Sequence, residues 1–199
     1  MRADAIVFGI AGSLFGLIIG WVLGSQQAAR SGPVAAPVAQ SAPAPSADAQ
    51  PRPAPIDPAR VAALQDAAAK SPKDVQPRVQ LGNMFFDGEQ YPQAITWYEQ
   101  ALALNPRDAN VSTDLGVAYY YTNQSDRALA QFDQSLAIDP KHVKTLLNIG
   151  IVRAFGKQDL AGAGKAWQQV VDLAPDSPEG LAAKKGLEGI RSAQGGGAK

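Results

Sequence analysis

Cysteine is absent from this chain of 199 residues, and histidine occurs once, as His142. Without cysteine there is no disulfide, no thiolate metal ligand and no cysteine nucleophile. Cysteine usage therefore does not indicate whether the protein works in an oxidising or a reducing compartment. Because His142 follows Pro140 in an expected surface turn, neither a zinc site nor a nucleophile–histidine triad is credible. We therefore expect no catalytic residue, no metal and no cofactor, and we predict that the protein is not an enzyme.

An excess of either charge is also missing. The chain holds 18 Lys and Arg residues against 18 Asp and Glu residues, and residues 59–199 alone carry 15 of each. A protein that binds nucleic acid needs a basic face, because cationic side chains must displace the counterions of the phosphates. The neutral balance therefore argues against nucleic acid as a partner.

Charge is absent altogether from Ala5 to Ala29, and Ala5–Gly24 is apolar apart from Ser13. A helix of about 20 residues rises roughly 30 Å, the thickness of the hydrocarbon core of a bilayer. We expect residues 1–27 to form an N-terminal transmembrane anchor with short flanks. A cleaved signal peptide is the alternative, although its apolar region would be shorter and a small-x-small cleavage site should follow directly.

The charges that flank this segment suggest its orientation. Arg2 and the terminal amine stand at one end, partly offset by Asp4, whereas Arg30 and Arg52 lie farther away on the other side. The positive-inside rule weakly favours a cytoplasmic N-terminus. The rest of the chain would then lie across the membrane. For a Gram-negative source this predicts a single-pass protein of the bacterial inner membrane with its soluble part in the periplasm.

A stripe of glycines runs along the expected transmembrane helix. Its members recur every four residues and share one helix face: Gly12, Gly16, Gly20 and Gly24. Small residues at this spacing let two helix backbones approach closely in lipid and can drive their association. The partner helix could belong to a second copy or to a different protein. The alternative is that glycine is simply common in membrane helices.

Residues 28–57 are rich in Pro and Ala, contain no aromatic residue and have only Val34, Val38 and Ile56 as aliphatic residues larger than Ala. Such a segment cannot bury enough apolar surface to fold. Its prolines favour an extended, semi-rigid tether that reaches up to roughly 90 Å. A Pro-rich docking motif is the alternative, but Pro43-Ala44-Pro45 is too short to claim one.

Beyond the expected tether, residues recur at an interval of 34 positions. Leu81-Gly82 returns as Leu115-Gly116 and then as Ile149-Gly150, and Pro106 returns as Pro140. A period of this length is typical of stacked helical hairpins, each of which buries its apolar face against its neighbours. Such stacks usually offer a surface to another protein and rarely carry chemistry.

The pattern resembles the tetratricopeptide repeat (TPR) family. In that family Leu-Gly and an aromatic residue mark the first helix, and Ala, an aromatic and a small residue mark the second, before a closing Pro. In residues 75–108 the matching residues are Leu81, Gly82, Phe85, Ala94, Tyr98, Ala101 and Pro106. In residues 109–142 they are Leu115, Gly116, Tyr119, Ala128, Phe132, Ser135 and Pro140. The resemblance implies an all-α solenoid.

A third unit departs from the pattern. Arg153 stands at the aromatic position, and one extra residue after Phe155 shifts Trp167 and Pro175 by one place. We still expect a third hairpin, a capping half-repeat before the first unit and a capping helix after the last. The expected TPR domain, residues 58–192, therefore divides into 58–74, 75–108, 109–142, 143–177 and 178–192, and residues 193–199 form a flexible tail.

The resemblance also implies a concave groove lined by the first helix of each pair. The family positions that line it are here Val79, Asn83, Phe86, Val117, Tyr120, Tyr121, Lys144, Leu147, Ile151 and Phe155. Aromatic residues grouped on such a face are typical of protein-binding sites. The alternative is that neighbouring helices cover them. We expect a protein or peptide segment as the partner.

One branch of the family grips the acidic C-terminal tails of heat-shock chaperones with Lys and Asn side chains. The matching positions here are Val79, Asn83, Asp114, Lys144 and Asn148. Only Asn83 and Lys144 fit this pattern, and Asp114 would repel a carboxylate. We therefore reject the chaperone-tail interpretation and expect an extended or helical apolar ligand.

The sequence thus predicts a non-catalytic, membrane-tethered adaptor that binds a protein segment in its groove. Membrane-anchored bacterial repeat proteins of this kind act in envelope assembly and in cytochrome c maturation, which is an analogy at the level of the fold. A structural subunit of a larger membrane complex, packed through its glycine-rich helix, is the alternative. A regulatory module for a separate enzyme is a third interpretation that the sequence does not distinguish.

Overall fold

The computed structural model describes residues 54–195. The transmembrane anchor predicted for residues 1–27, its glycine stripe, nearly all of the tether and the end of the tail lie outside the described residues. Within residues 54–195 the chain is all-α, with eight α-helices, one short π-helix and no strand. Their bounds are α2 (Pro58–Lys70), α3 (Gln76–Asp87), α4 (Tyr91–Leu104), α5 (Ala109–Tyr121), α6 (Ser125–Ile138), α7 (Val143–Ile151), η2 (Val152–Gly156), α8 (Leu160–Leu173) and α9 (Pro178–Gly195).

Local chemistry explains where several of these helices start. Asp57, Asp108 and Asp159 precede α2, α5 and α8, and each carboxylate accepts a hydrogen bond from a backbone N–H of the first turn, at 2.9, 3.0 and 2.8 Å. These bonds satisfy donors that a helix N-terminus otherwise leaves unpaired. Prolines stand in the first turn of α2, α3 and α4, where the missing N–H costs nothing.

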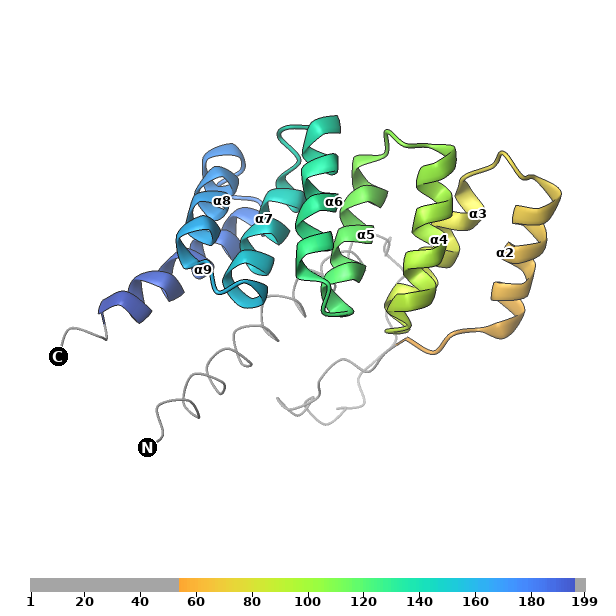
Figure 1. Ribbon diagram of the computed structural model, residues 1–199, viewed down its shortest axis with the longest axis horizontal. Helices are drawn as coiled ribbons and strands as arrows, with labels where there is room; N and C mark the ends of the chain where they lie inside the picture. The colour runs from red at the N-terminus through yellow and green to blue at the C-terminus, as the bar shows by residue number, and fades with distance from the viewer. Residues whose placement is uncertain (1–53, 196–199) are drawn as a thin grey trace, which may run out of the picture. The chain divides into compact units, whose positions relative to one another are not determined.

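Successive helices pack in chain order as antiparallel pairs, α3 with α4, α5 with α6 and α7 with α8, and α9 packs on α8 (Figure 1). A glycine of the first helix faces a large ring of the second in each pair. A Cβ atom added at the glycine would collide with that ring in all three: Gly82 with Tyr98, Gly116 with Phe132, and Gly150 with Trp167. The recurring spacing of glycine and a large aromatic residue along the chain therefore lets the two helices of each pair pack closely together.

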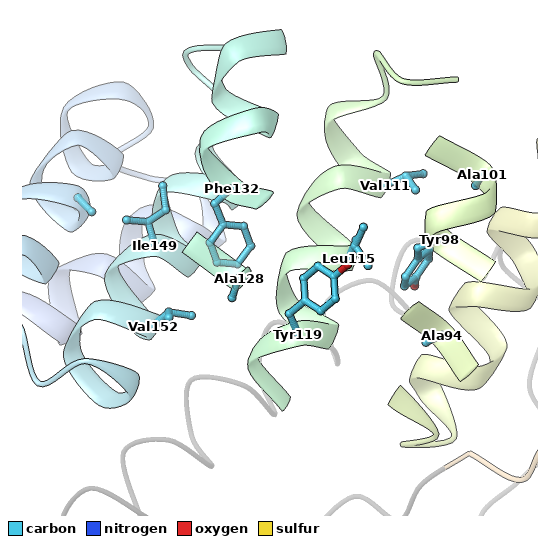
Figure 2. Packing of buried hydrophobic residues seen from close by; sticks show 11 residues of the cluster. Ala94, Tyr98, Ala101, Val111, Leu115, Tyr119, Ala128, Phe132, Ile149 and Val152 are labelled. Carbon is cyan, nitrogen blue, oxygen red and sulfur yellow. The ribbon is translucent and has the colours of Figure 1, made fainter. Parts of the chain in front are cut away.

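The core lies between the helices and continues from one pair to the next. Figure 2 shows Tyr98 of α4 beside Val111 and Leu115 of α5, and Phe132 of α6 beside Ile149 of α7. All five side chains are buried. Because each pair buries residues against the next, the described helices form a solenoid with one continuous apolar core.

The one-residue insertion of the third pair coincides with the π-helix η2. The backbone N–H of Lys157 donates to the carbonyl oxygen of Val152 at 3.0 Å, a bond that spans five residues and fits one more residue than an α-helical turn. The turn residue with positive φ consequently stands at Gln158, whereas Glu89 and Asn123 hold this place in the first two pairs. The contact between Gly150 and Trp167 shows that the insertion leaves α8 packed on α7.

Candidate functional site

The ten residues predicted to line a groove lie on the first helices of the three pairs. Val79, Asn83 and Phe86 lie on α3, Val117, Tyr120 and Tyr121 on α5, Lys144, Leu147 and Ile151 on α7, and Phe155 on η2. We call the side of the domain formed by these positions the first-helix face. Contacts join its helices directly, since Phe86 of α3 meets Tyr121 of α5 and Asp114 of α5 pairs with Lys144 of α7.

Two of the predicted groove residues are buried instead. Leu147 is 1% exposed and Ile151 is 5% exposed, so neither can meet a ligand in this conformation. The reason is that α6, α8 and α9 all pack against α7. The indole N–H of Trp167 also donates to the carbonyl oxygen of Leu147 at 3.1 Å, which holds α8 against this part of α7. We therefore assign both residues to the core.

Four aromatic rings form a cluster where α3, α4 and α5 meet. Tyr91 and Tyr121 stack with their centroids 4.5 Å apart and their planes within 6° of parallel. Phe86 meets both edge-on, at 5.4 Å from Tyr91 and 5.8 Å from Tyr121, and Tyr120 lies 6.1 Å from Tyr121. All four side chains are half-buried. Such rings give a rigid apolar surface that loses little entropy on binding.

Tyr91 is a member of this cluster that the sequence did not indicate as a site residue. It begins α4, immediately before Pro92, and the repeat pattern assigns no role to that position. Burial raises the pKa of its hydroxyl to about 12, and the negative charge of Glu89 contributes. Burial raises the pKa of Tyr120 to about 12 as well. Both hydroxyls are therefore neutral at physiological pH.

Charged groups of the three first helices interact with one another: Asp87 of α3, Asp114 of α5 and Lys144 of α7. The ammonium of Lys144 lies 2.8 Å from the carboxylate of Asp114, and both side chains are about one quarter exposed, at 26% and 25%. Partial desolvation raises the pKa of the Asp87 carboxyl above its usual range, and the nearby charge of Asp114 raises it further. The only chaperone-clamp cation that the sequence supplies, Lys144, is thus already neutralised within the domain.

The other residue that fits the chaperone clamp is also engaged. The side-chain oxygen of Asn83 accepts a hydrogen bond of 2.8 Å from the hydroxyl of Tyr98. The Tyr98 side chain is buried, so loss of this partner would leave its hydroxyl unsatisfied. Asn83 therefore has a structural role in the first pair, although its side chain reaches the first-helix face.

A buried polar network joins the second pair to the third. Thr113 of α5, Ser135 of α6 and Thr145 of α7 are fully buried, and their hydroxyl oxygens lie 2.6–3.0 Å apart. His142 extends the network, with Nδ1 2.6 Å from the Thr145 hydroxyl and Nε2 3.1 Å from the amide oxygen of Asn110. The amide oxygen of Asn110 can only accept a hydrogen bond, so the ring proton of neutral His142 lies on Nε2. Nδ1 then accepts a hydrogen bond from the hydroxyl of Thr145.

His142 stands in the turn where the sequence places it, but its imidazole also takes part in this buried network. It immediately precedes α7 and is half-buried. Burial lowers the pKa of its imidazole below the usual 6.5, and Lys144 lowers it further, while Asp139, Asp114 and Asp108 act in the opposite direction. The folded domain consequently favours neutral histidine.

This depressed pKa predicts how stability depends on pH. Between pH 7.5 and 5.5 the unfolded chain takes up a proton on His142 before the folded domain does, so protonation favours unfolding as the pH falls. We expect the thermal midpoint to fall over this interval, and to fall less in His142→Asn, because Asn cannot titrate and is a good residue at a helix start. Thermal unfolding followed by circular dichroism at both pH values measures the difference. An equal fall in both proteins would contradict the assignment.

Two negative findings apply to residues 54–195. No three His, Cys, Asp or Glu side chains there are placed to hold a metal ion together. No helix in the same range combines the length and the apolar character that a membrane span requires.

Comparisons with known proteins agree on the repeat. Residues 82–123 match a family model for the TPR repeat, and residues 113–178 match a second model for the tetratricopeptide repeat. No curated protein matches the sequence.

Solved structures of similar fold come from proteins of several kinds. The TPR domain of Sgt2 from Aspergillus fumigatus is 26% identical, with a TM-score of 0.54 over 60% of this chain and 78% of that one. The first TPR of Spaghetti (RPAP3), bound to the HSP90 peptide SRMEEVD, is 21% identical, with a TM-score of 0.53 over 70% and 97%. The chaperone SycD of Yersinia enterocolitica type III secretion, in complex with a peptide of the translocator YopD, is 18% identical, with a TM-score of 0.56 over 60% and 93%.

The glycine–ring contacts of the three pairs, the family models and the similar structures point to one architecture. The helices that the structure describes therefore form an all-α solenoid of the tetratricopeptide repeat type, within which residues 82–178 match models of that repeat.

Proposed function

We propose that this protein is a non-catalytic, membrane-tethered adaptor that holds a segment of another protein on its first-helix face. The observation that carries the proposal is the aromatic cluster of Phe86, Tyr91, Tyr120 and Tyr121, which presents half-buried rings on that face. Rings of this kind are enriched among the residues that dominate protein–protein binding energy. Two structures of similar fold hold peptides, from HSP90 and from YopD, which supports a peptide-binding role here.

Tethering rests on the sequence alone. The uncharged segment from Ala5 to Ala29 has the length of a membrane span, and residues 28–57 have the composition of an extended tether. In a Gram-negative bacterium this arrangement would place the solenoid in the periplasm, within reach of proteins at the inner membrane. Envelope assembly and cytochrome c maturation are roles in which such an adaptor would serve.

The alternative is a structural subunit of a larger membrane complex. The glycine stripe of the N-terminal segment supports it, because small residues at this spacing favour packing against another membrane helix. Detergent extraction from native membranes followed by native mass analysis separates the two. A free protein or a homodimer, whose partner appears only after crosslinking in the membrane, supports the adaptor. A fixed stoichiometric complex that survives extraction supports the subunit.

The glycine stripe gives a separate prediction. Replacement of Gly16 and Gly20 by Leu should strongly reduce lateral association, because the bulkier side chains keep the two helix backbones apart. A two-helix association assay in membranes measures the change, with Ser13→Ala as a substitution that conserves small size. Unchanged association of the double variant would show that the stripe does not pack against a partner.

A further inference from the structure

The aromatic cluster of the first-helix face is bordered by carboxylates. Asp87 follows Phe86 at the end of α3, Glu89 stands in the turn before Tyr91, and Asp114 lies on α5. The backbone N–H of Glu89 donates to the carbonyl oxygen of Phe86 at 2.9 Å, and Phe86 meets both Tyr91 and Tyr121, so the turn that carries Asp87 and Glu89 lies beside the rings. We call this set the acidic aromatic corner: Phe86, Asp87, Glu89, Tyr91, Asp114 and Tyr121.

The negative charge of the corner is only partly neutralised by the domain itself. Lys144 pairs with Asp114 at 2.8 Å. From the residues that the structure describes, no hydrogen bond or ion pair reaches the side chains of Asp87 or Glu89, both of which are exposed. Two carboxylates therefore stand beside the rings with no cation from residues 54–195 in contact with them.

The aromatic rings, like the carboxylates, favour a positively charged ligand. The faces of tyrosine and phenylalanine rings carry negative electrostatic potential and attract the ammonium of Lys or the guanidinium of Arg. The half-buried apolar surfaces of the same rings favour an apolar neighbour. A segment with a cationic side chain next to an apolar one matches both properties, whereas a carboxylate-rich tail would meet charge of its own sign.

We propose that the corner binds a partner segment in which a Lys or Arg side chain adjoins an apolar residue. The cation would lie between Asp87 and Glu89 against the tyrosines, and the apolar side chain would pack on Phe86. This inference rests on the proposed function and specifies the chemistry of its ligand. It assigns to this face the charge preference opposite to that of a clamp for acidic tails.

The chain itself supplies a competing occupant that the test must distinguish. The backbone N–H of Ala54 donates to the carbonyl oxygen of Asp87 at 3.1 Å, and the Ile56 side chain lies where a Cβ at Gly88 would fall, so the chain enters the domain next to the corner. Arg52 stands two residues earlier in the sequence. The chain itself therefore carries a cationic side chain, that of Arg52, only two residues before the segment that contacts the corner.

The experiment uses the full chain in micelles of a nonionic detergent and two fluorescent decapeptides with blocked ends. One peptide alternates Leu with Arg, and the other alternates Leu with Glu. We expect the Arg peptide to bind at least ten-fold more tightly by fluorescence anisotropy. The double variant Asp87→Asn with Glu89→Gln should weaken the Arg peptide about ten-fold. The matched control, Asp133→Asn with Glu188→Gln, removes the same charge from exposed positions on α6 and α9 and should change little.

Three results would overturn the inference. Equal or tighter binding of the Glu peptide would refute the charge preference, and an equal effect of both double variants would show that only net charge matters. If the Arg peptide bound ten-fold more tightly to Arg52→Ala than to the unsubstituted protein, the tether would be identified as the occupant of the corner. None of these results bears on whether the first-helix face captures a protein, which crosslinking of that face tests independently. Thermal melting of every variant separates a lost ligand site from a lost fold.

Discussion

Phe132→Ala should lower the free energy of unfolding of the helical domain by about 3–5 kcal/mol, the cost of emptying a ring-sized volume in a packed core. Phe132 is 0% exposed and lies against the backbone of Gly116, which closes the α5–α6 pair. Helix α6 also packs on α7, so the cavity would loosen two successive pairs. Since domains of this size are stable by only about 5–15 kcal/mol, such a loss would leave little reserve.

Chemical denaturation followed by circular dichroism measures this loss. Leu104→Ala is the matched control, because Leu104 ends α4 with 41% of its surface exposed and should cost well under 1 kcal/mol. The rule that glycine and ring close each hairpin would be wrong if the two substitutions had similar effects.

The second large effect concerns binding. Tyr121→Ala should weaken capture of the native partner about 30-fold, equivalent to roughly 2 kcal/mol, because truncation of a central ring at an interface removes a dominant contact. Tyr121 stacks on Tyr91 and meets Phe86, so its loss disorders the whole aromatic surface. Titration of the purified partner against the full chain measures the change.

Tyr121→Phe is the control for this prediction. It keeps the ring and therefore the stack with Tyr91, and we expect partner affinity to fall by no more than about ten-fold, since one paired hydroxyl contributes about 0.5–1.5 kcal/mol. If Tyr121→Ala binds normally while remaining folded, the aromatic cluster is not the binding surface.

The sequence was sufficient to predict the fold because each hairpin closes through a pair of residues at a constant separation. Gly82 with Tyr98 and Gly116 with Phe132 are 16 positions apart, and Gly150 with Trp167 are 17 apart. The extra residue of the third pair is visible in the alignment of the repeats. Its structural form, the π-helix η2, was not predictable, because an insertion could equally have lengthened the turn.

The binding face was less accessible to sequence reasoning, because it depends on what neighbouring helices cover. Leu147 and Ile151 occupy the same positions in the repeat as exposed or half-buried residues of α3, yet packing around α7 buries them. The network of Thr113, Ser135 and Thr145 arises only when three helices meet. A single sequence gives no sign of such a network beyond the substitution of Ser135 for the usual Ala.

Site-specific photo-crosslinking in native membranes tests the central claim, that the first-helix face captures a protein. Gln76 of α3 and Gln100 of α4 are both exposed, one on the first helix and one on the second helix of the same pair. A photoreactive residue at Gln76 should give a discrete crosslinked partner that disappears in Tyr121→Ala, and one at Gln100 should give none. Equal crosslinking from both positions, or none from Gln76 in the folded protein, would contradict the account.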